Sequence, residues 1–130
     1  MTTTAKNRGN ETTRVALVGC GRISNRHIEA IGANDTVEIA LVCDIDEGRA
    51  KAAGERLSVP YLTDYRQIEG VDLVSVLTPS GLHPRHAAEI AETTDVPNIL
   101  VEKPISLTLR EVYELFGRMD RAGKRLLPVY

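Results

Sequence analysis

The stretch that decides the fold runs from Arg14 to Ser24 and reads Arg-Val-Ala-Leu-Val-Gly-Cys-Gly-Arg-Ile-Ser. Its compact apolar run, residues 14–18, predicts a strand that is covered on both faces. Gly19 ends that run, and a helix is expected from about Arg22 to Ile31. Residues 19–24 therefore predict a tight turn that joins a buried strand to a helix.

The rest of the chain repeats this alternation of short apolar runs and helical patterns. Further strands are expected at residues 37–43, 60–62, 72–77, 98–101 and from 126 onward. The helices between them are expected at residues 46–57, 64–67 and 84–92, begun by Asp46, Asp64 and Pro84. Strands that alternate with helices form a parallel sheet with helices on both faces, so the sequence predicts a doubly wound (Rossmann) α/β fold.

The last helix is predicted by a capping box, Thr108-x-x-Glu111, in which each side chain satisfies a free backbone N–H group. Gly123 is placed to end this helix, before the sixth strand begins. An apolar stripe at helical spacing is expected to face the core, and it consists of Leu109, Val112, Tyr113, Phe116 and Met119.

The composition is that of one soluble globular domain. The chain has 130 residues, of which 42% are hydrophobic and 26% are charged, enough for one core. With a net charge of -2 and no tryptophan, neither nucleic acid nor a membrane surface is an expected partner. Residues 1–13 are polar and lack the apolar segment of a secretion signal. We expect them to be a disordered lead to a domain at residues 14–130 of a cytoplasmic protein.

The two cysteines, Cys20 and Cys43, lack the spacing of a metal-binding pair, and no metal site is expected. Two reduced thiols are the expectation for a cytoplasmic protein. Both cysteines are predicted to lie near the same edge of the sheet, so a regulatory disulfide is the alternative.

The turn at residues 19–24 has the features of a dinucleotide-binding loop. Gly19 permits the tight turn, Gly21 lets a pyrophosphate approach the backbone, and the small Ser24 lets helix and strand pack closely. The N–H groups at the helix start and the helix dipole both favour negative charge there. The alternative is a strand-to-helix turn that binds nothing.

Asp44 stands at the end of the second expected strand, where a ribose-binding acid follows the glycine loop in dinucleotide sites. Its carboxylate can accept hydrogen bonds from both hydroxyls of the adenosine ribose, and it would repel the 2′-phosphate of NADP. Asp46 adds negative charge and no arginine follows at once, so the sequence favours NAD over NADP. Alternatively, Asp44 only caps the next helix.

Two later loops complete the candidate site. Residues 78–83, Thr-Pro-Ser-Gly-Leu-His, follow the fourth strand and are expected to face the glycine loop across the crevice where the strand order reverses. Residues 102–104, Glu-Lys-Pro, follow the fifth strand, and Lys103 can donate a hydrogen bond to a substrate oxygen and stabilise an alkoxide. Taken singly, the first loop also fits a plain turn, and the second fits a solvated charge pair.

Of the three histidines, His83 is the functional candidate because it lies in a loop. His27 is expected to pack within the first helix or at an interface. His86 is expected to be a surface residue of the helix that follows.

In their order and spacing, these motifs resemble those of the glucose-fructose oxidoreductase, inositol dehydrogenase and rhizopine-catabolism (Gfo/Idh/MocA) family. The resemblance covers about residues 14–130, and Glu-Lys-Pro at its distance from Thr-Pro-x-x-x-His is the most specific part. It implies an NAD site with Gly19, Gly21, Arg22 and Ile23 at the pyrophosphate, Asp44 and Ile45 at the adenosine ribose, and Thr78, Pro79, Ser80 and His83 along the cleft.

The resemblance also implies roles for the Glu-Lys-Pro loop. Glu102 would bind the nicotinamide ribose, and Lys103 would contact the cofactor, orient the substrate and help in proton handling. The Lys103–Pro104 peptide bond is expected to be cis. Two residues depart from the family pattern: Ser80 stands where asparagine is usual, and Ser24 where glycine or alanine is usual.

Members of this family carry a second α+β domain that supplies the substrate pocket, a further acid/base residue and an oligomer interface. The sequence stops at Tyr130, where the sixth strand is starting. We therefore expect a fragment or split gene product: the NAD-binding half of a dehydrogenase that acts on a sugar, cyclitol or nucleotide-sugar hydroxyl. We expect it to be inactive alone and homo-oligomeric when complete. The alternatives are a non-catalytic NAD-responsive sensor or docking module and an S-adenosylmethionine-dependent methyltransferase, which fits the two later loops poorly.

Overall fold

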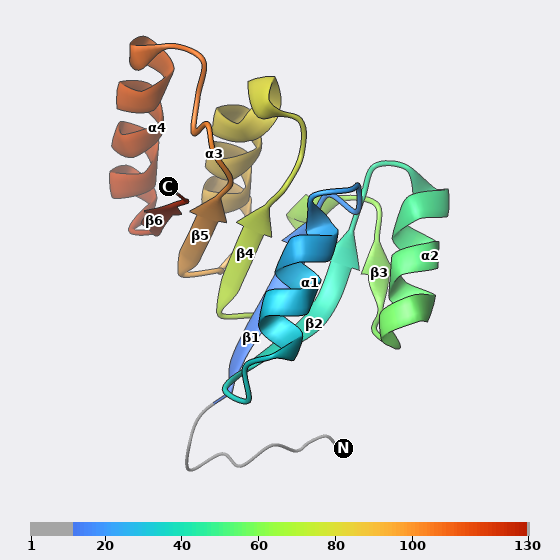
Figure 1. Cartoon of the computed structure of the whole chain (residues 1–130). Helices are drawn as coiled ribbons and strands as arrows, with labels where there is room; N and C mark the ends of the chain where they lie inside the picture. The colour runs from blue at the N-terminus through green and yellow to red at the C-terminus, as the bar shows by residue number, and fades with distance from the viewer. Residues whose placement is uncertain (1–11, 130) are drawn as a thin grey trace.

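Six short apolar segments pair into one parallel sheet with the strand order β3-β2-β1-β4-β5-β6 (Figure 1). The computed structural model describes residues 12–129. The strands are β1 (Thr13–Val18), β2 (Val37–Cys43), β3 (Tyr61–Leu62), β4 (Leu73–Val76), β5 (Asn98–Val101) and β6 (Arg125–Pro128). The order reverses between β1 and β4, as in a doubly wound sheet, and the predicted fold class is confirmed.

The helices cover both faces of this sheet (Figure 1). They are α1 (Ser24–Gly32), α2 (Glu47–Leu57), α3 (His83–Thr93) and α4 (Leu109–Ala122), with 3₁₀ turns η2 (Tyr65–Gln67) and η3 (Ser80–Leu82). Alternate β1 residues face two separate apolar clusters. Val15 and Leu17 lie in the cluster with α1 and α2, whereas Ala16 and Val18 lie in the cluster with α3 and α4. Within residues 12–129, no helix has both the length and the apolarity that a bilayer span requires.

The helix ends are determined by local side-chain chemistry, as predicted except for one half of the capping box. The N–H of Thr108 donates to the Ser106 hydroxyl and not to Glu111, whose carboxylate accepts from the hydroxyls of Ser106 and Thr108. The side chains of Asp46, Asp64 and Thr108 accept hydrogen bonds from backbone N–H groups in the first turns of α2, η2 and α4. Gly123 ends α4 in the left-handed conformation, with φ of +71°. Each of the side-chain caps at a helix start is worth about 1 kcal/mol.

The boundaries at the start of the chain differ from those expected. Thr12 is buried and Thr13 is the first residue of β1, where it pairs with Val37, so the ordered domain begins before residue 14. The disorder expected for residues 1–11 falls outside the described residues. Helix α1 begins at Ser24 rather than Arg22, because the glycine loop still turns through Arg22 and Ile23.

The predicted core face of α4 was wrong for three of its five residues. Leu109 and Tyr113 are 69% and 71% exposed, and Phe116 is 41% exposed, whereas Leu115 and Met119 are buried in the core. Helix α4 has apolar residues on two faces, so the pattern alone cannot choose between them. Contact with α3, which lies beside α4 in Figure 1, buries the face that contains Leu115 and Met119.

Candidate functional site

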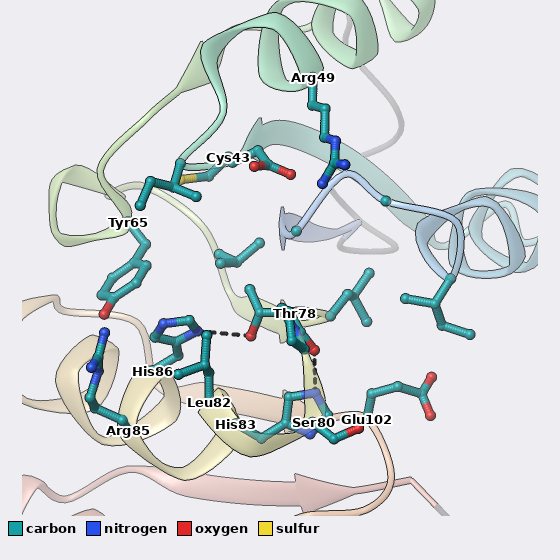
Figure 2. A pocket seen from close by; sticks show the side chains of 18 of the residues that line it. Cys43, Arg49, Tyr65, Thr78, Ser80, Leu82, His83, Arg85, His86 and Glu102 are labelled. Atoms are coloured by element: carbon teal, nitrogen blue, oxygen red, sulfur yellow. Dashed lines mark hydrogen bonds between the residues drawn. The ribbon is translucent and has the colours of Figure 1, made fainter.

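A cleft of about 990 Å³ lies at the carboxyl ends of the strands, around the point where the strand order reverses (Figure 2). The loops after β1, β2, β4 and β5 all contribute to its lining. Ligands of doubly wound sheets bind in this crevice. The structure brings all the site residues predicted from the sequence to this cleft: Gly19, Gly21, Arg22, Ile23, Asp44, Ile45, Thr78, Pro79, Ser80, His83, Glu102 and Lys103.

Gly19 holds the glycine loop against the loop after β4. Its φ is +103°, and its N–H group donates to the carbonyl oxygen of Cys43 (2.8 Å). A Cβ atom at this position would lie 2.8 Å from the backbone carbon and oxygen of Leu77. Only glycine fits both the conformation and the contact, so the predicted facing of the two loops is confirmed.

Gly21 is in the opposite situation, because no atom lies within 4 Å of the position that its Cβ would take. The backbone N–H groups of residues 21–23 donate to no acceptor in the described chain. The Ser24 hydroxyl donates to the carbonyl of Gly21 (2.6 Å) and so supports the turn. This open cradle of free donors at a helix start fits the pyrophosphate of a dinucleotide.

Asp44 has a structural role that the sequence did not reveal. Its Oδ2 accepts a hydrogen bond from the N–H of Cys20 and its Oδ1 one from the N–H of Asp46, both at 2.8 Å. The residue is 8% exposed and lines the cleft. Asp46, not Asp44, caps α2, so the helix-cap alternative for Asp44 is wrong. Each carboxylate oxygen keeps a second acceptor site, which can take a ribose hydroxyl.

The two cysteines are free, and their surroundings differ. Cys43 lies in the apolar cluster of α3 and α4, whereas Cys20 packs against the cluster on the other face. Burial and then the Asp44 charge raise the pKa of Cys20 to about 11. Burial and then the neighbouring Cys20 raise the pKa of Cys43 to about 12. Both are protonated, poorly nucleophilic thiols at neutral pH.

The Glu-Lys-Pro loop is anchored at Glu102. His27 Nε2 lies 2.8 Å from Glu102 Oε1, and the N–H of Lys103 donates to Oε2 (3.0 Å). Burial opposes ionisation of Glu102, but these hydrogen bonds and the charges of His27 and Lys103 outweigh it and lower its pKa. The Glu102 side chain is only 13% exposed, so the solvated charge pair considered above is wrong for this residue. The Lys103–Pro104 bond is cis, as predicted.

His83 lies between the two later loops, but it is the first residue of α3 and not a loop residue as expected. Its Nδ1 is 2.8 Å from the carbonyl oxygen of Pro104 and its Nε2 is 2.6 Å from the carbonyl oxygen of Thr78. The residue is 2% exposed, although it forms part of the cleft wall (Figure 2). Its ring nitrogens therefore contact the protein backbone.

His86 was wrongly predicted to lie on the surface. It is buried, and its Nδ1 lies 2.8 Å from the Thr78 hydroxyl oxygen (Figure 2). Its ring packs against Tyr65, with the ring centroids 5.2 Å apart. Burial and then the charge of Arg85 lower its pKa, so His86 is neutral at pH 7. The helix pattern could not reveal this, because the neighbour that covers His86 comes from a distant turn.

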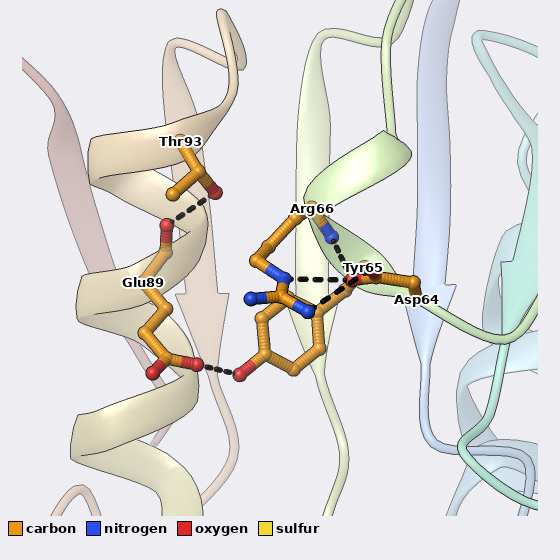
Figure 3. Close-up of polar contacts among 5 residues, drawn as sticks. All are labelled: Asp64, Tyr65, Arg66, Glu89 and Thr93. Atoms are coloured by element: carbon orange, nitrogen blue, oxygen red, sulfur yellow. Dashed lines mark hydrogen bonds and ion pairs between the residues drawn. The ribbon is translucent and has the colours of Figure 1, made fainter.

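One end of the cleft is formed by residues that sequence reasoning did not assign to it. Tyr65 extends from η2 to α3, where its hydroxyl donates to Glu89 (Figure 3). Burial, followed by the hydrogen bond to Glu89, raises the pKa of Tyr65 to about 12. Arg49 and Arg85 line the same cleft from α2 and α3. The only available signal was topological, since the turn after β3 reaches the same edge of the sheet as the other loops.

No group of three or more His, Cys, Asp or Glu side chains within residues 12–129 could hold a metal ion.

Residues 13–130 match the model of a family described as an oxidoreductase family with an NAD-binding Rossmann fold. Among curated proteins, D-apiose dehydrogenase from Paraburkholderia graminis is 34% identical over 86% of this chain and 30% of its own length. Inositol 2-dehydrogenase from Renibacterium salmoninarum is 40% identical over 88% of this chain and 35% of its own length. The chain thus spans about a third of these relatives.

Solved structures agree with this match. The WlbA dehydrogenase from Bordetella pertussis, in complex with NADH and UDP-GlcNAcA, superposes with a TM-score of 0.84 and 32% identity. The superposition covers 92% of this chain and 37% of that one. The WlbA dehydrogenase from Chromobacterium violaceum is 38% identical, with a TM-score of 0.83 over 92% of this chain and 35% of that one.

Proposed function

The chain belongs to the Gfo/Idh/MocA oxidoreductase family and is its NAD-binding Rossmann domain, and on that premise we propose that it is the cofactor-binding half of a dehydrogenase. The reaction is oxidation or reduction at a hydroxyl carbon of a sugar, cyclitol or nucleotide-sugar. These are the substrate types named for its relatives, among them an apiose, an inositol and a UDP-sugar. The complete protein is proposed to be cytoplasmic and homo-oligomeric, with this chain as a fragment that is inactive alone.

The single observation that carries this proposal is the meeting of the glycine loop, Asp44 and the Glu-Lys-Pro loop in one cleft. When bound there, NAD supplies a nicotinamide ring that accepts or returns a hydride. The free N–H groups of residues 21–23 bind the pyrophosphate, and Asp44 binds the adenosine ribose. Glu102 binds the nicotinamide ribose, with its charge maintained by His27.

Lys103 is the proposed catalytic residue of this half. Its backbone is held next to Glu102, while its side chain is exposed at the cleft. An ammonium group at this position donates a hydrogen bond to the substrate oxygen and stabilises negative charge that develops on it. The residue that completes proton transfer is proposed to come from the substrate domain.

We expect this chain to bind NADH at least about tenfold more tightly than NADPH, because the carboxylate of Asp44 repels the 2′-phosphate. The measurement is a fluorescence titration with each nucleotide at one ionic strength. Asp44→Ala should weaken NADH binding and reduce the ratio between the affinities for NADH and NADPH. This variant also leaves the N–H groups of Cys20 and Asp46 without their acceptor, so its unfolding temperature is measured alongside. Equal or tighter binding of NADPH by the unsubstituted chain would overturn the assignment of Asp44.

We expect Lys103→Ala to reduce kcat by about 10²- to 10⁴-fold, the range associated with loss of a positioned acid or base. The assay uses a chimera in which this chain replaces the matching domain of the Renibacterium inositol 2-dehydrogenase, with inositol and NAD as substrates. NADH affinity should change much less than kcat. The 130-residue chain alone is the zero-activity baseline. Near-normal turnover by the substituted chimera would show that Lys103 is not catalytic.

A further inference from the structure

The loop that carries Lys103 is bonded to the rest of the protein on both sides of that residue. Before it, Glu102 is paired with His27 from α1. After it, the carbonyl of Pro104 contacts His83 at the start of α3. Lys103 itself uses only its backbone N–H, and within residues 12–129 its ammonium group makes no hydrogen bond or ion pair. The unbonded side chain of Lys103 therefore lies between two residues, Glu102 and Pro104, that are each held by a histidine.

The His27 contact connects the loop to the helix that begins in the glycine loop. The His27 and Glu102 side chains are 18% and 13% exposed, so solvent screens their pairing only partly. A carboxylate oxygen only accepts, so Nε2 of His27 is the donor. Without this donor, Oε1 of Glu102 would be a largely buried charged atom with no protein partner, and the side chain would move toward water.

The His83 contact connects the same loop to the loop after β4. Both of its acceptors, the carbonyls of Pro104 and Thr78, belong to the backbone. A ring with two N–H groups donates to both at once, and a neutral ring donates to one of them. Since His83 is almost fully buried, few other positions are open to the ring.

We infer that His27 and His83 are positioning residues that hold the Glu102–Pro104 loop from both sides, so that Lys103 is presented to the cleft in one place. This inference rests on the proposed function for the role of Lys103 and, in its second test, for where NADH and ADP bind. The two histidines act through Glu102 and Pro104 and do not themselves contact a substrate. Holding a reactive group by its neighbours preserves its geometry and leaves its own charge available.

Glutamine and asparagine should have opposite effects at the two histidine positions: the amide that preserves the hydrogen bond at one position should lose it at the other. A glutamine amide extends to about the position of Nε2, and an asparagine amide to that of Nδ1. His27 bonds to Glu102 through Nε2, so His27→Gln should keep this hydrogen bond and His27→Asn should lose it. His83 bonds to the Pro104 carbonyl through Nδ1, so His83→Asn should keep that hydrogen bond and His83→Gln should lose it. If the histidines only filled space, glutamine, which is the larger amide, would be the better replacement at both positions.

The test measures hydrogen exchange at the amide of Lys103, which donates to Glu102 Oε2, in the 130-residue chain without cofactor. His27→Asn and His83→Gln should each raise its exchange rate by about tenfold, as expected for loss of one hydrogen bond near a charged group. His27→Gln and His83→Asn should stay within about threefold of the unsubstituted chain. Amides of β4 provide the folding control, and Glu29→Gln, an exposed change on α1, is the matched control.

A second readout separates loop position from general damage. ADP occupies only the glycine loop and the Asp44 side of the cleft, so its affinity should be equal in all variants. NADH affinity should fall by about tenfold in His27→Asn and His83→Gln alone. Equal Lys103 exchange in all four variants, or rescue by glutamine at both positions, would overturn the inference. An unsubstituted chain that binds ADP but not NADH would instead contradict the proposed function and leave the exchange result to stand on its own.

Discussion

Gly19→Ala is expected to lower the free energy of unfolding by about 2–6 kcal/mol, which is the largest effect on stability that we predict for one methyl group. Two costs combine at this position. The φ of +103° is unfavourable for any residue with a Cβ, and that Cβ would lie 2.8 Å from the Leu77 carbonyl. The Leu77 atoms belong to the backbone beyond a central strand, so they cannot rotate away as a side chain could.

The measurement is thermal and urea denaturation followed by circular dichroism, and the unfolding temperature should fall by about 10 °C or more. Gly123→Ala is the matched control, because Gly123 also has a positive φ, +71°, but no atom near the position of its Cβ. That control isolates the conformational cost, about 1 kcal/mol. If Gly19→Ala destabilises the chain no more than Gly123→Ala does, the close approach of the two loops is wrong.

Gly21→Ala is expected to have the opposite profile, with a normal fold and NADH affinity lowered by about 100-fold. Open space surrounds the position of the new Cβ, so the free energy of unfolding should change by less than about 1 kcal/mol. The methyl group would stand where a pyrophosphate must approach the free N–H groups of residues 21–23. Loss of one or two hydrogen bonds to a charged group, each worth about 1.5–3 kcal/mol, accounts for the expected change in affinity.

Titration of NADH by fluorescence measures this effect, and isothermal calorimetry with NAD repeats it without the optical signal. Gly32→Ala is the control, since Gly32 also has an open environment but lies at the far end of α1. It should bind NADH as the unsubstituted chain does. Wild-type affinity in Gly21→Ala would mean that the cofactor does not approach the backbone at this loop.

The parts of the fold that could be predicted from the sequence are those with local causes. Asp46, Thr108 and Gly123 mark helix ends because each satisfies backbone groups, or adopts a φ, within its own turn. The alternation of strands and helices then leaves few possible topologies. The doubly wound order in turn places the ends of β1, β2, β4 and β5 at one edge, which is why all twelve predicted site residues line one cleft.

The errors came where a residue's environment depends on distant segments. The exposed Tyr113 and the buried Leu115 lie on two apolar faces of α4, and only the position of α3 decides between them. The helix pattern places His86 on the surface, but Tyr65, which comes from another turn, packs against its ring. The hydrogen bond from the glycine loop to Asp44 was also missed, because it depends on the pairing of β1 with β2.

By itself, the sequence determined the class of sheet, the order of the loops and the residue types offered at the cleft, because helix caps, glycine turns and strand patterns act over a few residues. Only the tertiary structure decided how those residues are supported. The backbone of Leu77 leaves room only for glycine at position 19. The loop that carries Lys103 is contacted by His27 on one side and by His83 on the other. Such contacts join segments that are far apart in the chain, and their geometry exists only after the whole sheet has formed.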